Sequence, residues 1–277
     1  MTTPLAPPLD YFSALMQSDA EIPLLEATFR MAQYAYPDLD VQQQLEVVDE
    51  MAAFILKCVP HELPPAERLT LFNEVFYRVY RYRGNVGKGY VTQQVHLNVV
   101  LHSRVGSTVA LGVLWLELAR RIGLSVWSTI VSGADALVVA AELEDWTVLL
   151  DPQSGRVVQA DELQIMQTLM PYDERRDADA DIDLALKAAT SLDILVHMLR
   201  ELRDIHRSDG ATAQLIAVLD QLLILQPDAW RDRRDRGLAH ASAHHVPEAL
   251  ADLEAYLPHA DGEIEQQVIA QHLAKLR

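Results

Sequence analysis

The fold of this chain is decided by residues 107–131, which read STVALGVLWLELARRIGLSVWSTIV. The first part predicts a helix over Ser107–Ile122, because the hydroxyl of Ser107 or Thr108 can cap the first turn and a long apolar run follows. Gly123 suits the left-handed residue that ends many helices. The pattern then changes to the β-branched run Val126–Val131, which is typical of a strand. We therefore expect a helix that leads directly into a sheet.

Two further strands are predicted after the first. Ala136–Ala140 and Trp146–Leu150 are also short, rich in β-branched or large apolar residues and bounded by polar turns. Three strands joined by short turns favour a small antiparallel sheet packed against the Ser107–Ile122 helix. This part of the chain is expected to be α+β.

Helical patterns lie on both sides of this region, so the fold class is predicted to be α+β and predominantly helical. Within residues 9–80, two apolar stripes have helical spacing: Leu24, Leu25, Phe29 and Ala32, then Leu45, Val48, Met51, Ala52 and Ile55. Five more helices are predicted at 182–206, 211–226, 230–243, 247–257 and 263–276. Gly237 and Ala249 are spaced as in tetratricopeptide repeats, where small residues let paired helices approach closely. We expect two domains, residues 1–177 and residues 178–277.

Composition excludes several classes of protein. The 277 residues include 40 acidic and 23 basic ones, a formal net charge of −17. Such a chain repels phosphate groups, so neither nucleic acid nor a membrane is expected as a partner. The single cysteine, Cys58, excludes an internal disulfide and a multi-cysteine zinc site, and we expect it to be a half-buried thiol. The first ten residues lack the pattern of a secretion signal, which favours a cytoplasmic protein.

Several segments resemble a known bacterial family. Residues 104–111, 116–124 and 146–155 are similar to the transglutaminase-like family named after the invasion regulator SirB. Residues 234–238 and 248–257 are similar to that family's tetratricopeptide-like tail. The resemblance covers roughly residues 70–277. It implies a degenerate transglutaminase-like (papain-like) core with a small antiparallel sheet, followed by tetratricopeptide-like helices.

The resemblance also shows which catalytic residues are missing. The superfamily uses a thiolate at a helix N-terminus, with a histidine and an aspartate from neighbouring strands. Thr108 stands at the cysteine position, where this family usually has proline, and Ala134 stands at the histidine position. Asp151 remains, and Gln94-Val95 replaces an Asn-Ser pair of the family. A threonine without an adjacent base is a very weak nucleophile, so Thr108 is interpreted as a capping residue and Asp151 as a turn residue. No catalytic residue is assigned.

Three other clusters have structural interpretations that compete with functional ones. His240, His244 and His245 lie on a predicted helix, but without a third ligand or an intervening glutamate they favour a packing or exposed role, and no metal is expected. The run Arg231–Arg236 alternates in sign, which indicates a solvated or internally salt-bridged helix. The alternative is a partner-binding patch made by Arg231, Arg233, Arg234 and Arg236. The family resemblance suggests instead that Arg236 anchors the tail to the N-terminal half.

Aromatic residues interleave with arginines between Tyr77 and Tyr90. Such a pattern can stack nucleobases, but helical spacing puts Phe72, Phe76 and Tyr80 on one face and favours core packing. The glycine-rich segment 83–90 lacks the sequence of a phosphate loop and is predicted to be a surface loop.

Two functions follow from this reading. The first is a non-catalytic protein-interaction or regulatory module, which needs no cofactor and binds a protein or peptide partner. The alternative is a residual hydrolase or amide-processing enzyme, in which Asp151 works with an unrecognised base such as His96 or His102.

Overall fold

The computed structural model describes residues 8–16, 22–85, 91–131, 136–144, 146–159, 162 and 187–277. The chain divides into two compact units. The first unit combines residues 1–20, 33–37 and 199–277, and the second combines residues 21–32 and 38–198. The domain boundary predicted at residues 177 and 178 lies outside the described residues.

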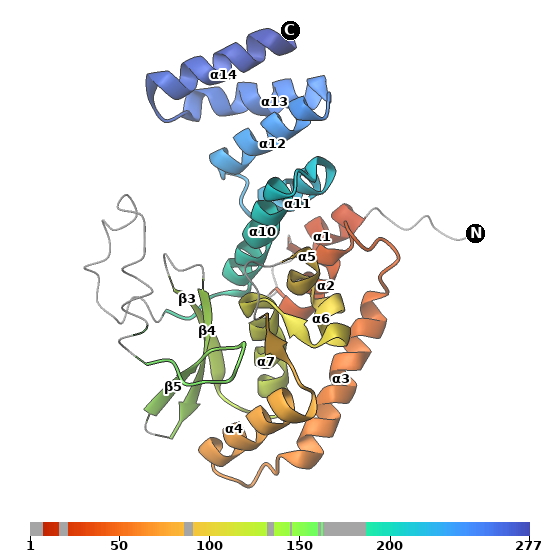
Figure 1. The fold of residues 1–277 in the computed structure, drawn as a ribbon, viewed down its shortest axis with the longest axis vertical. Coiled ribbons are helices and arrows are strands. Elements are labelled where there is room, and N and C mark those ends of the chain that lie inside the picture. Colours follow the sequence, from red (N-terminus) through yellow and green to blue (C-terminus); the bar gives the residue numbers. More distant parts are fainter. Residues whose placement is uncertain are drawn as a thin grey trace. The chain divides into compact units, whose positions relative to one another are not determined.

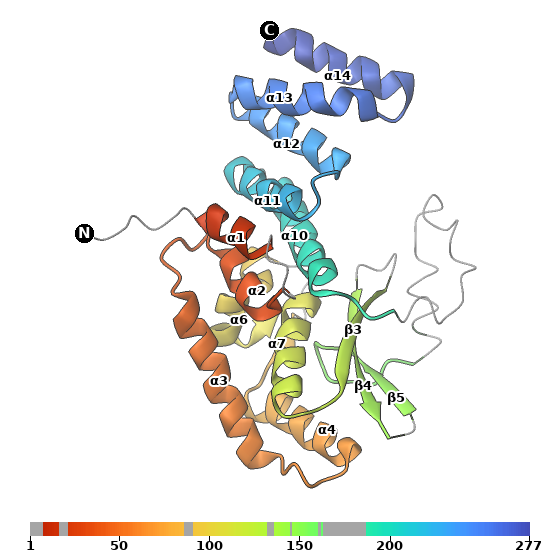
Figure 2. The same ribbon diagram turned by 180° about the vertical axis from the view of Figure 1, so that it is seen from behind.

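The second unit is built around one helix and a three-stranded antiparallel sheet, which lie side by side in Figures 1 and 2. The helix is α7 (Thr108–Arg121), and the strands, in the order β3-β4-β5, are β3 (Val126–Val131), β4 (Ala136–Leu143) and β5 (Trp146–Leu150). Val131 pairs with Ala136, and Leu143 pairs with Trp146. The predicted helix and strands are confirmed, and so is the α+β, predominantly helical class.

Helix α7 is buried nearly all round, as its apolar sequence requires. Ser107 is its cap, because the Ser107 hydroxyl accepts the backbone N–H of Ala110 at 3.4 Å, and Thr108 is the first helical residue. Trp115 is fully buried and donates its indole N–H to Asn73 Oδ1 at 2.9 Å. This bond ties the middle of α7 to the end of helix α4 (Pro65–Asn73).

The remaining α-helices of this unit that the structure describes are α2 (Leu24–Ala32), α3 (Val41–Cys58), α4 (Pro65–Asn73), α5 (Thr92–Val95) and α6 (Leu97–Ser103). The two predicted apolar stripes are buried except at Leu45, which is half-buried. Asp40 caps α3 by accepting the N–H of Gln43 at 3.1 Å. Because α3 starts at Val41, its buried face contains Val41, Gln44 and Val48. Gln44 is therefore buried in place of Leu45, which the predicted stripe had put on this face.

One π-helical turn interrupts the aromatic face predicted after α4. In the segment η1 (Glu74–Val79), the N–H of Tyr80 bonds to the carbonyl of Val75, five residues earlier, at 2.9 Å. The wider turn shifts the register, so Tyr80 is only half-buried. Tyr82 takes its place, buried and stacked on Phe76 with ring centroids 4.8 Å apart. Core packing of these aromatics is confirmed, with Tyr82 in the position predicted for Tyr80.

The predicted loop over residues 83–90 begins with a strand. β1 (Arg83–Gly84) pairs in parallel with β2 (Val105–Gly106), which directly precedes α7. Residues 86–90, which include Tyr90, lie outside the described part of the chain.

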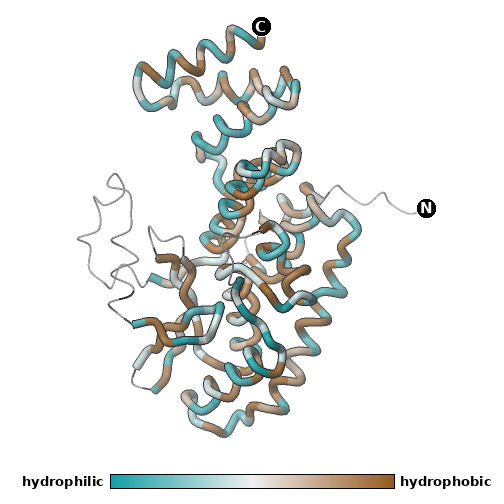
Figure 3. The backbone as a smooth tube through the Cα atoms, viewed as in Figure 1, coloured by the Kyte–Doolittle hydropathy of each residue, from teal (hydrophilic) through white to brown (hydrophobic). Residues whose placement is uncertain are grey.

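The first unit contains α1 (Pro8–Met16) and the C-terminal helices. These are α11 (Thr212–Leu225), α12 (Trp230–Ser242), α13 (Val246–Tyr256) and α14 (Gly262–Leu276), with a 3-10 turn, η3 (Leu257–His259), after α13. A β-carbon at Gly237 would lie 2.9 Å from Leu253 Cγ, so α12 and α13 approach as closely as the Gly237–Ala249 spacing predicted. Figure 3 shows that α12 is largely hydrophilic, in keeping with its run of arginines and aspartates.

The helix α10 (Ser191–Ser208) starts later than predicted. The boundary between the two units falls within its sequence, after Met198. Residues 187–190 are not helical, and Thr190 forms a reciprocal cap with Asp193. Thr190 Oγ1 accepts the N–H of Asp193 at 3.1 Å, and Asp193 Oδ2 accepts the N–H of Thr190 at 2.9 Å. The predicted start at residue 182 is wrong because this capping box stops the helix on its N-terminal side.

Candidate functional site

The N-terminus of α7 is the position at which the superfamily's nucleophile would stand. Thr108 occupies it, and the side-chain amide of Gln153 donates to Thr108 Oγ1 at 2.6 Å. Next to it, the N–H of Ser107 donates to the carbonyl of Gln94 at 2.7 Å. The side chain of Gln153, in the turn after β5, is therefore hydrogen-bonded to the Thr108 hydroxyl at the start of α7.

The turn that carries Gln153 is held together by Asp151. Asp151 Oδ1 accepts the N–H of Gln153 at 2.9 Å, and Asp151 Oδ2 accepts the hydroxyl of Ser154 at 2.7 Å. Its backbone is also paired, since the N–H of Asp151 donates to the carbonyl of Arg156 at 2.9 Å. Both carboxylate oxygens are thus used to shape the turn, and within the described residues neither bonds to a histidine.

Neighbouring elements fix the same turn in place. The hydroxyl of Tyr77, at the π-helical turn, donates to the carbonyl of Pro152 at 3.0 Å. Burial raises the pKa of Tyr77, and the nearby Asp151 charge raises it further, so the phenol stays a hydrogen-bond donor. The N–H of Gly84 in β1 donates to the carbonyl of Gln153 at 3.0 Å. Gln153 is a site residue that the sequence analysis missed, although it lies within the matched segment 146–155.

Of the other residues predicted around this site, Ala134 lies outside the described residues. His96 is buried at the start of α6, and His102 is exposed on that helix. His102 Nδ1 lies 2.9 Å from the carbonyl of Asn98, its own helix's backbone. No hydrogen bond of Asp151 in the described part of the chain reaches either histidine.

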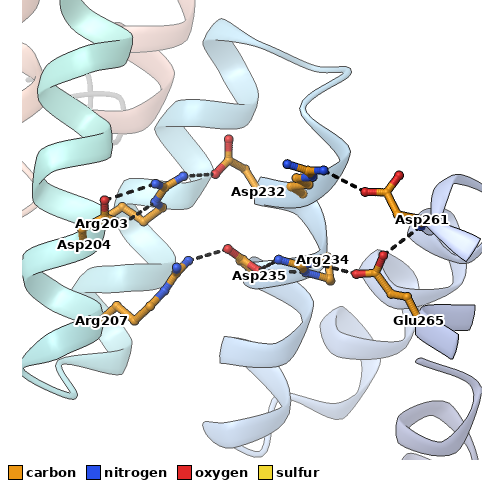
Figure 4. Close-up of polar contacts among 9 residues, drawn as sticks. Arg203, Asp204, Arg207, Asp232, Arg234, Asp235, Asp261 and Glu265 are labelled. Carbon is orange, nitrogen blue, oxygen red and sulfur yellow. Dashed lines mark hydrogen bonds and ion pairs between the residues drawn. The ribbon is translucent and has the colours of Figure 1, made fainter. Parts of the chain in front are cut away.

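The charged residues of α12, both arginines and aspartates, form ion pairs with residues of neighbouring segments. Figure 4 shows that these pairs link α10 to α12 and α12 to the α14 region. Arg203 bonds to Asp232 at 2.8 Å, Arg207 pairs with Asp235, Arg234 bonds to Glu265 at 2.6 Å, and Arg231 bonds to Asp261 at 2.8 Å. The ion pairs therefore connect α12 to α10 on one side and to the start of α14 on the other.

Arg236 of α12 bonds to the helices on both sides of it, α11 and α13. Its guanidinium donates twice to Asp252 of α13, at 2.6 and 2.7 Å, and once to Asp220 of α11, at 2.8 Å. The hydrogen bonds to Asp252 raise the pKa of Arg236, so the side chain remains charged. The expectation that Arg236 anchors the tail to the N-terminal half is wrong, because both partners belong to the tail itself.

The four candidate partner-binding arginines differ in accessibility. The side chain of Arg231 is 78% exposed, whereas those of Arg233, Arg234 and Arg236 are 26%, 28% and 22% exposed. Arg233 also lies over the ring of Trp230, with 5.4 Å between its guanidinium carbon and the ring centroid.

His244 and His245 are exposed, in keeping with their structural interpretation, whereas the shared helix of the histidines and the half-buried position of Cys58 are not found. Helix α12 ends at Ser242, and His244 has a left-handed φ of 61°, so His240 and His244 do not share a helix face. His240 instead faces His245, with 3.3 Å between their Nδ1 atoms. Among the described residues, no group of three histidine, cysteine or acidic side chains is placed to hold a metal ion. Cys58, predicted to be half-buried, is exposed at the end of α3.

Comparison with known sequences places this geometry in a family. The sequence profile of the transglutaminase-like superfamily matches residues 41–200. The chain belongs to the transglutaminase-like superfamily. A tetratricopeptide repeat profile matches residues 202–276 of this transglutaminase-like protein, which confirms the tail.

Its relatives cover most of its length. A UPF0162 protein of Xylella fastidiosa (strain Temecula1) is 27% identical over 93% of this chain and 91% of its own length. The UPF0162 protein YchA of Escherichia coli (strain K12) is 24% identical over 80% of each chain. Protein SirB1 of Salmonella typhimurium (strain LT2) is 23% identical over 85% of this chain and 86% of its own. The resemblance to the SirB-type family is confirmed. No solved structure matches the chain.

Within the described residues, none of the helices combines the length and apolar character needed to cross a bilayer.

Proposed function

We propose that this transglutaminase-like protein is a non-catalytic protein-interaction or regulatory module that works without a cofactor. The observation that carries the proposal is the contact between Gln153 and Thr108 Oγ1 at 2.6 Å. Any substrate attacked at this helix N-terminus would have to displace the Gln153 amide, whose backbone is also held by Gly84. A hydroxyl that accepts the Gln153 amide would have to release this bond before it could attack a substrate.

The state of Asp151 supports the same proposal. Its two oxygens accept from Gln153 and Ser154, so its role is to hold the turn, and among the described residues no imidazole is hydrogen-bonded to it. In the alternative, an amide-processing enzyme, Asp151 would need His96 or His102 as a base, and the hydrogen bonds of the site give no support for that pairing.

The tetratricopeptide tail supplies the interaction surface in this proposal. Such repeats generally mediate protein–protein contacts, and their stacked helices create extended binding surfaces. Arg231 is the most accessible of the four candidate arginines, and its exposed pair with Asp261 can exchange for a partner's carboxylate at little cost. Arg233, Arg234 and Arg236 act within the repeat, where they join neighbouring helices.

Affinity capture with the full-length chain tests this proposal. Wild type, Thr108→Ala and Asp151→Asn are used as bait in extract of the native cell, with Arg231→Glu as the surface variant. We expect the first three to retain the same protein in near-stoichiometric amounts and Arg231→Glu to retain less of it.

Two results would contradict the non-catalytic proposal. If Asp151→Asn alone accumulates a new covalent or tightly bound species, the pocket processes a substrate and the non-catalytic proposal fails. A purified turnover assay whose rate follows a group titrating near neutrality would lead to the same conclusion.

A further inference from the structure

A cavity of about 530 Å³ lies in the second unit, away from the Thr108 site, between the start of α3 and helix α6. Leu39 and Val99 form apolar walls, and Gln44, Asn98, His102 and Ser103 provide polar ones. This volume falls within the usual range of small-molecule sites. None of the six lining residues carries a formal charge at neutral pH.

Two of the polar lining residues have a buried side-chain oxygen that no described residue hydrogen-bonds. Gln44 is 7% exposed and Asn98 is 8% exposed. Gln44 Oε1 and Asn98 Oδ1 bond to nothing in the described part of the chain. Buried polar side chains in folded proteins are normally paired, because an unsatisfied carboxamide loses its hydration without compensation. Two such carboxamides lining one cavity, Gln44 from α3 and Asn98 from α6, are therefore costly to the fold unless something else satisfies them.

His102 adds a third polar group of defined character. Its Nδ1 lies 2.9 Å from the carbonyl of Asn98. Because a carbonyl oxygen only accepts, Nδ1 is the donor in this bond, and in the tautomer with one proton on Nδ1 the Nε2 atom is an acceptor. The lining thus combines two carboxamides, each with a donor and an acceptor, and one further acceptor.

We propose that the cavity lined by Gln44, Asn98 and His102 is a binding site for a small neutral ligand that bears a carboxamide or peptide amide group. A carboxamide pairs with an amide through one N–H donor and one carbonyl acceptor, so Gln44 and Asn98 match both halves of such a ligand. The lack of charged lining residues argues against an anion or a cation, whose desolvation would go uncompensated. Leu39 and Val99 would pack against the apolar remainder of the ligand.

Ligand titrations monitored by the side-chain amide NMR signals test the proposal. Nicotinamide represents a free carboxamide, N-acetylglycinamide represents a peptide amide, and nicotinate is the anionic control of nearly the same shape. We expect saturable shifts of the Gln44 and Asn98 side-chain signals with at least one of the amides, and weaker binding of nicotinate by about tenfold or more. If nicotinamide binds more tightly, the ligand carries a free carboxamide, and if N-acetylglycinamide binds more tightly, it carries a peptide amide. The absence of saturable shifts with both amides would overturn the proposal.

Matched variants of the full chain complete the test. Gln44→Met replaces the buried carboxamide with an apolar side chain of similar size, and Gln43→Met changes its exposed neighbour on the same helix. We expect Gln44→Met to weaken amide binding about tenfold or more and to leave the unfolding midpoint unchanged or raised. Gln43→Met should bind like wild type. His102→Phe, at an exposed position, should also bind more weakly.

A fall in the unfolding midpoint of Gln44→Met, greater than that of Gln43→Met, would show that the Gln44 carboxamide serves the fold instead, and the proposal would fail. Wild-type affinity in both Gln44→Met and His102→Phe would overturn it as well.

Discussion

Asp151 is the residue type that the family resemblance implies at its position, but here its contacts with Gln153 and Ser154 are structural. In this chain the aspartate shapes a turn, and the turn delivers a glutamine onto the N-terminus of α7. The burial of Tyr77 against the same turn, with its hydroxyl on Pro152, adds a second anchor. Hydrogen bonds to Asp151 and from Tyr77 thus hold the turn that carries Gln153.

Gly155 provides a test of that rigidity at the level of one residue. It has a left-handed φ of 69°, and a β-carbon there would collide with the ring of Tyr77. Gly210 has a similar φ of 66°, with nothing within 4 Å of the added carbon. Gly210→Ala should lower the free energy of unfolding by about 1 kcal/mol, from backbone strain alone. Gly155→Ala should lower it by about 3 kcal/mol, because steric overlap adds to the strain.

Urea unfolding of both variants measures the difference. Equal losses would mean that the ring of Tyr77 moves aside freely and that the turn is not held as tightly as its hydrogen bonds indicate.

At the scale of elements, the sequence predicted those helices and strands whose apolar residues recur with a regular period. The cap at Ser107, Gly123 and the β-branched runs located α7 and the three strands to within a residue or a few. Three features escaped the patterns because each depends on contacts or on a local hydrogen bond. The π-helical turn moved Tyr80 out of the core, the Thr190–Asp193 box delayed α10, and the start of α3 buried Gln44.

The candidate site was only partly predictable for the same reason. Thr108 and Asp151 stand at positions fixed by the matched segments, whereas the contact of Gln153 with Thr108 joins residues 45 positions apart in sequence. The pairing of Arg236 with both Asp220 and Asp252 could not be predicted either, because an alternating charge run offers many equivalent partners.

Arg236 gives the prediction at this scale, since it joins α11, α12 and α13. The side chain of Asp252 is 5% exposed, so removing its main cation leaves a buried carboxylate with only Arg233 at 3.8 Å. Arg236→Met should therefore lower the free energy of unfolding by about 3 kcal/mol. Arg231→Met, which breaks a pair exposed on both sides, should lower it by at most about 1 kcal/mol.

Chemical unfolding followed by helical circular dichroism would compare the two variants in the full chain. A double variant, Arg236→Met with Asp252→Leu, should recover most of the loss, because it removes the buried charge together with its partner. Failure of that recovery would mean that the packing of the arginine stem, rather than the ion pair, joins the helices.

At the scale of the whole molecule, burial of histidine makes stability depend on pH. His206 is 6% exposed, and its Nε2 lies 2.6 Å from the hydroxyl of Tyr34. Burial lowers the pKa of His206, against the weaker opposing effect of Asp209. Burial likewise lowers the pKa of His240. Both histidines belong to the first unit, so acid sensitivity is expected to be concentrated there.

The sign of the effect follows from these shifts. Because the folded pKa lies below the unfolded value, the unfolded chain binds protons first as the pH falls, and stability that is present above about pH 6.5 is lost below it. Each histidine contributes a slope of at most about 1.4 kcal/mol per pH unit. The protection factors of the amides in α11–α14, which correct for the slower intrinsic exchange at low pH, should therefore fall on acidification from about pH 7.5 to 5.5. His206→Gln keeps an acceptor for Tyr34 but cannot titrate, so it should show a shallower dependence. An unchanged slope in His206→Gln combined with His240→Gln would assign the acid response to other groups.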